Sequence, residues 1–167
     1  MTDETAPPAS ERVLLSTRKE YLEALERLAG LAQRDLRMFD DDMSELGIDS
    51  PRTHELLRAF LLRGRDNHLY MAVHNSDFIR NYCPRLLDLL RQFSDRMFIH
   101  RTEGDAARAQ DSLVLADKLH FVRRPVQAQP RAVLRLHDEQ ESQAIYLRYL
   151  EIWESSVPAI SATTSGL

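Results

Sequence analysis

The sequence has few of the residues on which many sites depend, since its 167 residues include one cysteine and five glycines. Cys83 cannot form a disulfide within the chain, and one thiolate cannot build a zinc cluster. The glycines stand at positions 30, 47, 64, 104 and 166, so neither GxGxxG nor GxxxxGK occurs and nucleotide binding by those loops is excluded. HExxH, a histidine pair four residues apart and GxSxG are also missing, so we expect no metal and no cofactor.

Long apolar segments are missing as well. The longest uninterrupted apolar run is five residues, from Leu69 to Val73. A membrane-spanning helix needs roughly 20 predominantly apolar residues, so we expect no membrane span. The sequence begins MTDETAPPASE, which is acidic where a secretory signal is basic, and no apolar stretch follows it. These features predict a cytoplasmic protein.

The charge of the chain is small but unevenly distributed. The net charge is -4, yet residues 51–137 hold 15 basic and 9 acidic residues, and the acidic excess lies on either side of them. Acidic end segments that pack against a basic centre explain this pattern, and so does an anion-binding surface. Nucleic-acid binding through the Arg-rich centre is an alternative, although an overall positive charge, the usual mark of such proteins, is missing.

Apolar periodicity and capping residues predict helices and strands in alternation. Thr17 and Glu20 have capping-box spacing, and Pro84 predicts a break in a helical pattern. We expect helices over 17–33, 50–64, 76–93 and from Asp138 onward, and strands over 36–39, 68–74, 97–100, 112–116, 119–122 and 133–136. The strand at 68–74 is apolar on both faces, as in a parallel sheet covered by helices.

This order predicts a single α/β domain over residues 12–156, a mixed sheet with helices on both faces. Residues 1–11 and 157–167 show no apolar periodicity, so we expect two disordered tails. Trp153 shares a face with Tyr149 and Ile152 on the final helix and is expected in the core.

Several polar groups are candidates for a site. Asp40, Asp41 and Asp42 could hold a hard cation, although turn acids exposed to solvent are the preferred interpretation. His74, Asn75 and His100 follow or end predicted strands, where ligands collect in open α/β sheets, although ordinary surface roles account for them as well. A phosphate could be bound by the arginines of the later strands, Arg123, Arg124, Arg131 and Arg135, or these could be solvated hairpin residues.

The predicted hairpin carries a degraded motif. It reads QDSLVLAD from Gln110 to Asp117, and the region 17–155 resembles one half of the phospholipase D superfamily, in which this hairpin carries H-x-K-x4-D. On that motif Gln110 takes the His position, Ser112 the Lys position, and Asp117 matches the Asp. The chain is also similar to a set of uncharacterised bacterial domains with the same degraded pattern.

The resemblance implies a phospholipase D-like fold that has lost its chemistry. In the family the His attacks phosphorus, a second such His protonates the leaving group and the Lys neutralises the phosphoryl group. Gln cannot replace the nucleophile, and H-x-[KR] occurs nowhere in this sequence. A half-unit of this family tends to pair with a second half, which implies a homodimer or a partner domain from another chain.

We therefore predict a non-catalytic binding or interaction module, for which a phosphate-containing ligand is one candidate. The enzyme alternative is a hydrolase or transferase that uses His74, His100 or His120 with Asp117 in a rebuilt pocket.

Overall fold

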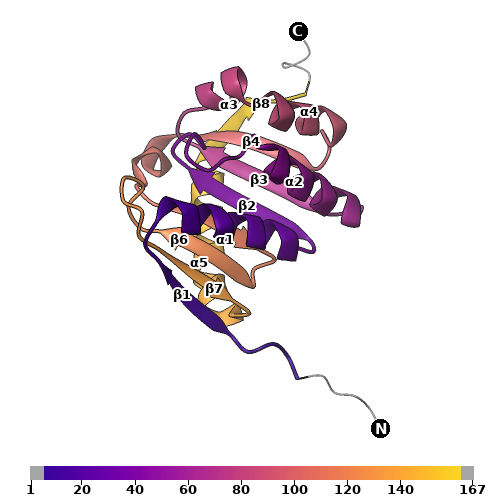
Figure 1. Ribbon diagram of the computed structural model, residues 1–167. Coiled ribbons are helices and arrows are strands. Elements are labelled where there is room, and N and C mark those ends of the chain that lie inside the picture. Colours follow the sequence, from indigo (N-terminus) through magenta and orange to yellow (C-terminus); the bar gives the residue numbers. More distant parts are fainter. Residues whose placement is uncertain (1–5, 163–167) are drawn as a thin grey trace.

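Eight strands form one mixed sheet in the computed structural model, which describes residues 6–162 (Figure 1). The spatial order is β1-β7-β6-β5-β2-β3-β4-β8, in which β2, β3 and β4 are parallel and the other neighbours are antiparallel. The strands are β1 Glu11–Leu15, β2 Asp35–Asp40, β3 His68–Val73, β4 Met97–Thr102, β5 Ser112–Ala116, β6 His120–Arg124, β7 Ala132–Leu136 and β8 Ser156–Ile160. The mixed α/β architecture predicted from the sequence is confirmed.

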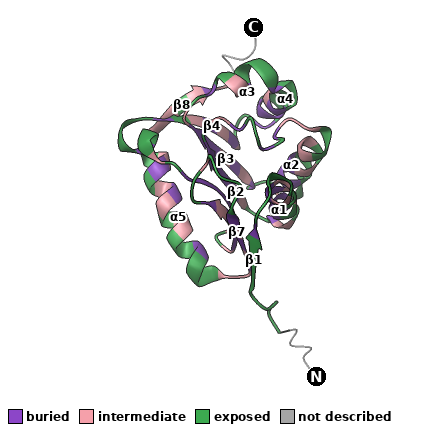
Figure 2. Cartoon of the chain, turned by 60° about the vertical axis from the view of Figure 1, so that its left-hand side comes forward, coloured by how far each residue is buried: buried purple, intermediate pink, exposed green. Residues whose placement is uncertain are grey.

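Helices cover both faces of the sheet, but unequally (Figure 2). One face carries α1 Arg18–Leu31, α2 Pro51–Arg63, α3 Asp77–Tyr82 and α4 Pro84–Gln92, and the other carries α5 Glu139–Glu154. A short 3-10 helix, η1 Gly104–Arg108, follows β4. None of the helices within residues 6–162 is both long enough and apolar enough to cross a membrane.

Local sequence signals set the helix ends. The side chain of Thr17 accepts a hydrogen bond from the Glu20 amide at 3.1 Å, and the Glu20 carboxylate accepts one from the amide of Ser16, one residue before the cap, so the expected capping box forms in a shifted variant. Cys83 ends α3 and Pro84 begins α4, so the predicted helix over 76–93 is broken where proline removes a backbone donor.

The two faces of the sheet have separate cores. The α1–α4 side buries most of the large aliphatic residues, whereas the α5 side has a small core of Phe39, Ala72, Ala106, Leu113, Tyr149 and Ile152. Trp153 is only half-buried, so its expected core position is wrong. Ile152 occupies the face of α5 that points to the sheet. Because a helix turns about 100° per residue, the next side chain, Trp153, points to the border of that face.

Both expected tails contribute an edge strand. Glu11 and the four residues after it form β1, paired with β7, and 156–160 form β8, paired with β4. The tail predictions are therefore wrong for Glu11 and for 157–160, because an edge strand is held by backbone pairing rather than by an apolar face. Pro158 lies in β8, and an edge strand tolerates proline, which has no backbone donor. Residues 1–5 and 163–167 lie outside the described residues.

Candidate functional site

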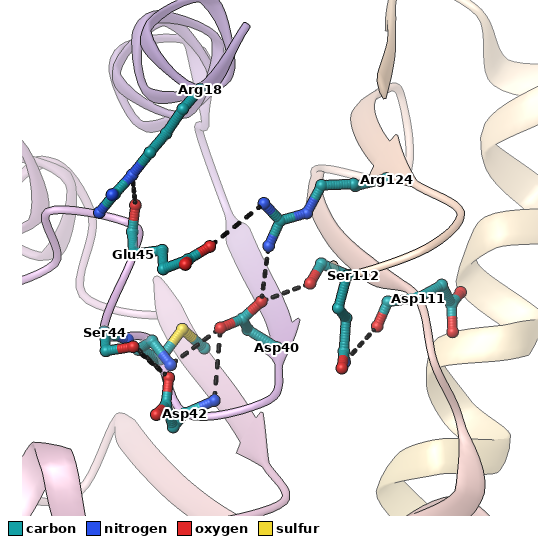
Figure 3. Close-up of polar contacts among 10 residues, drawn as sticks. Arg18, Asp40, Asp42, Ser44, Glu45, Asp111, Ser112 and Arg124 are labelled. Carbon is teal, nitrogen blue, oxygen red and sulfur yellow. Dashed lines mark hydrogen bonds and ion pairs between the residues drawn. The ribbon is translucent and has the colours of Figure 1, made fainter. Parts of the chain in front are cut away.

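The first candidate residues lie where the hairpin meets β2. Because β5 runs antiparallel to β2, with Leu113 opposite Phe39, the start of β5 lies beside the carboxyl end of β2. Ser112 thereby faces Asp40, and Arg124 at the end of β6 lies beside both (Figure 3). All three side chains are buried, at 0%, 3% and 4% exposure.

Both oxygens of the Asp40 carboxylate have partners. The Ser112 hydroxyl donates to Oδ1, and Arg124 Nη2 donates to the same oxygen at 3.4 Å. The amide of Met43 donates to Oδ2 at 2.9 Å. On its other side, Arg124 Nη1 lies 3.7 Å from the carboxylate of Glu45. The only basic group of this network is therefore shared between two carboxylates.

Tyr21 of α1 lies beneath this network. Its ring centroid is 5.0 Å from the guanidinium carbon of Arg124. Burial and then the negative charge of Asp40 raise the pKa of Tyr21 well above its ordinary value, so the phenol stays neutral.

A cleft of about 360 Å³ opens over Asp40. Its lining consists of Asp40, Asp41, Asp42, Ser44, Glu45, Gln110, Arg124, Val126, Gln127 and Ala128, which is four carboxylates against one guanidinium. Partial burial, followed by the charges of Asp42 and Asp40, raises the pKa of Asp41. The cleft is therefore a region of negative potential that disfavours anions.

Asp111 points to the opposite side of the hairpin, toward α5 (Figure 3). Arg148 binds its carboxylate with two hydrogen bonds of 2.7 and 2.6 Å, and Arg123 Nε donates at 3.1 Å. Burial alone would raise the pKa of Asp111, but these two guanidinium groups hold it below its usual value. Arg148 therefore fixes the start of the hairpin to α5, while Arg123 joins β6 to the same carboxylate.

The strand-end residues do not form a common pocket. His74 Nε2 donates to the Ala109 carbonyl at 2.7 Å, and its Nδ1 is hydrogen-bonded to the Thr102 hydroxyl at 2.5 Å. The Asn75 side chain accepts from the amide of Asp77 at the start of α3. His100 stacks on Trp153, with ring centroids 3.7 Å apart. Burial lowers the pKa of His100, which favours its neutral form.

His120 and Asp117 lie at the other end of the hairpin. Asp117 follows β5 at the turn, where its carboxylate accepts hydrogen bonds from the amides of 33, 34 and 35 at 2.7, 2.7 and 3.1 Å. His120 Nδ1 accepts from the amide of His137. Asp117 therefore joins the hairpin to the loop before β2 and lies away from Gln110 and Ser112 at the cleft end.

The four candidate arginines separate: Arg124 lines the cleft with the three acids, whereas Arg123 binds Asp111 on the other side of the hairpin. Arg135 pairs with Asp138 at 3.0 Å, and Arg131 is exposed just before β7. Within residues 6–162, no three His, Cys, Asp or Glu side chains come together in a way that could hold a metal ion. The central role of Asp40 was missed because its partners stand 72 and 84 residues further along the chain. The signal available in the sequence was a serine at the Lys position of the motif.

A family model described as "Domain of unknown function (DUF7931)" matches residues 17–162. No curated protein matches the sequence. Among solved structures, TrmBL2, described as an archaeal chromatin protein with a novel mode of DNA binding, has a TM-score of 0.68 at 12% identity and covers 94% of this chain. This chain spans 57% of TrmBL2.

Two further structures are a phospholipase D family member and a phosphatidylserine synthase. Nuc, a phospholipase D family member from Salmonella typhimurium, has a TM-score of 0.66 at 10% identity, with 92% of this chain and 100% of Nuc covered. Phosphatidylserine synthase from Haemophilus influenzae Rd KW20 has a TM-score of 0.55 at 13% identity, with 93% of this chain and 41% of the synthase covered. The fold is therefore phospholipase D-like, as the hairpin and element order predicted.

Proposed function

The chain belongs to the DUF7931 family, and from that premise we propose that it is a non-catalytic binding module built on a phospholipase D-like fold. The observation that carries the proposal is the buried network of Asp40, Ser112 and Arg124, which occupies the end of the hairpin where the motif would supply its catalytic groups. Within it the Asp40 carboxylate has all its partners from the chain itself, whereas the buried Arg124 Nε and the Tyr21 hydroxyl beside it have no hydrogen-bond partner among residues 6–162.

The chemistry at the cleft supports this proposal. Phosphoryl transfer needs a nucleophile and cationic groups that face the phosphate. Gln110 is exposed but is not a nucleophile, and Ser112 is fully buried, so a substrate cannot reach its hydroxyl. Arg124 is neutralised by Asp40 and Glu45, and the remaining lining carboxylates repel a phosphodiester.

The enzyme with a rebuilt His/Asp pocket finds little support. His74 has both ring nitrogens engaged, His100 is stacked on Trp153, and His120 lies at the far end of the hairpin. Asp117 is engaged by three backbone amides. In the part of the chain that the structure describes, no histidine is hydrogen-bonded to this carboxylate as a general base would be.

A second candidate function is nucleic-acid binding. It is favoured by the excess of basic residues in the centre of the chain and by the likeness of the fold to TrmBL2, whose description names DNA binding.

For the binding module itself, the partner is a second copy of the chain or another protein. Sedimentation of the purified chain distinguishes the two. A dimer means that the partner is a second copy, whereas a monomer at all concentrations means that the partner is another protein.

Purified protein is expected to hydrolyse neither bis(p-nitrophenyl) phosphate nor a labelled oligonucleotide. Rates should equal those of Gln110→Ala and of the buffer, with and without divalent cations, because Gln110 and Ser112 replace the His and Lys of the motif and the cleft is lined by four carboxylates. Gln110 is exposed, so this variant should fold normally. Turnover that copurifies with the protein and is lost in Gln110→Ala would contradict the proposal.

A further inference from the structure

Aromatic rings line the α5 side of β3 and β4. Tyr70 is the direct cross-strand partner of Phe98, with ring centroids 5.6 Å apart. His68 stands two residues before Tyr70 on β3, and His100 stands two residues after Phe98 on β4. All four side chains therefore point to the same face of the sheet. The planes of His68, Tyr70 and Phe98 lie within 18° of one another. The two strands thus present an ordered array of rings rather than isolated aromatic residues.

Helix α5 borders this array and leaves part of it exposed. Trp153 stacks on His100 and meets Tyr70 edge-on at 5.4 Å, and Tyr146 stands seven residues earlier on the same side of the helix. The rings of the aromatic surface, defined as His68, Tyr70, Phe98, His100, Tyr146 and Trp153, are all half-buried. On the opposite face of the same strands, Leu69, Met71, Met97 and Ile99 are at most 1% exposed.

Cations alternate with these rings. The Arg37 guanidinium lies between Tyr70 and Tyr146, 5.1 and 4.9 Å from the ring centroids, and Lys118 Nζ lies 4.1 Å from the centroid of Tyr146. Arg37 is buried and also lies 3.7 Å from Asp35, so it holds the rings in place. Lys118 is exposed at the hairpin turn and can meet a charged ligand.

We propose that the aromatic surface binds single-stranded nucleic acid, with bases stacked on the rings and Lys118 at a phosphate. Ring faces beside a cation suit unpaired bases, which stack on aromatic side chains whatever their sequence. The bases of a duplex are already stacked on one another and cannot reach the rings. The inference deepens the nucleic-acid candidate and locates it away from the acidic cleft.

This arrangement also reconciles binding with a net negative chain. Stacking supplies the affinity, so the protein does not need a large basic footprint. With one phosphate contact, the logarithm of the binding constant should fall with the logarithm of salt concentration with a slope of about -0.7. Binding through the arginines of the central region would give a much steeper slope.

The fluorescence of Trp153 provides a local readout, since this is the only tryptophan and it belongs to the aromatic surface. Titration of the full chain with dT and U oligomers of about ten nucleotides, a length typical of one stacking site, should quench it saturably. A duplex of the same length should have little effect. Quenching by dT, by U or by both identifies DNA, RNA or either as the ligand.

Two tyrosine variants make a matched pair. Tyr70→Leu should weaken binding by about 5- to 150-fold, the range for loss of one stacked base. Tyr82→Leu should leave binding unchanged, because Tyr82 is 68% exposed on α3, which covers the other face of the sheet. Phe98→Leu provides the same test if Tyr70→Leu does not fold.

The inference is overturned if no oligomer quenches Trp153, or if Tyr70→Leu and Tyr82→Leu bind alike. Binding with a steep salt dependence that survives Tyr70→Leu would instead place nucleic acid on another surface. None of these outcomes bears on the absence of phosphodiester turnover, so the failure of this inference is distinguishable from failure of the non-catalytic proposal.

Discussion

Replacement of Asp40 by alanine is expected to lower the free energy of unfolding by about 3–5 kcal/mol, the cost of removing one partner from a buried ion pair. Arg124 would keep its charge at 4% exposure with only Glu45 nearby, at 3.7 Å. The Ser112 hydroxyl and the Met43 amide would also lose their acceptor. Urea unfolding followed by circular dichroism measures the difference.

The neighbouring carboxylate is the control for this variant. Asp41 is exposed and lines the same cleft, so Asp41→Ala should change the free energy of unfolding by less than about 0.5 kcal/mol. If the two variants are equally stable, Asp40 is not the centre of a buried network, and the physical basis for an inert cleft is lost.

Replacement of Tyr149 by alanine is the second large effect expected, again about 3–5 kcal/mol. Tyr149 is 1% exposed and lies at the centre of the small core under α5. Its hydroxyl donates to the Met38 carbonyl at 3.1 Å, so Tyr149→Phe, which keeps the ring, should cost only about 0.5–1.5 kcal/mol.

The exposed Leu147, on the same helix, is the control, and Leu147→Ala should be close to neutral. Thermal unfolding of the three variants checks this order. A Tyr149→Ala protein as stable as Leu147→Ala would mean that α5 does not depend on this contact with the sheet.

Local signals in the sequence were sufficient for most of the helices and for the central strands. Thr17 with Glu20, and Pro84, act on backbone groups only a few residues away, so their effects can be derived from spacing alone. The edge strands β1 and β8 were missed because each is held by pairing with a strand distant in the sequence, and neither alternates between apolar and polar residues.

The site was less predictable than the fold for the same reason. Ser112 and Asp117 were chosen from a motif, and the structure places one beside Asp40 and the other against the loop before β2. Asp40 stood among three consecutive acids, and nothing local distinguishes the buried one from the exposed Asp41. Such a distinction depends on contacts with the hairpin, which periodicity does not reveal.

The half-buried state of Trp153 has the same origin. Its spacing from Tyr149 and Ile152 suggested one buried face, but the core under α5 is small and ends at Ile152. The ring instead stacks on His100 at the border of the sheet, where it becomes part of the aromatic surface.

The most direct measurement of the central claim is a titration with inorganic phosphate and tungstate, followed by nuclear magnetic resonance of the Gln110 and Gln127 side-chain amides and the Ser112 backbone amide. A cleft lined by four carboxylates and one guanidinium should not hold a phosphoryl group, so these resonances should stay unchanged at millimolar anion. A saturable shift centred on Gln110 and Ser112 would contradict the account, because it would mean that the cleft still binds the group on which phospholipase D-like enzymes act.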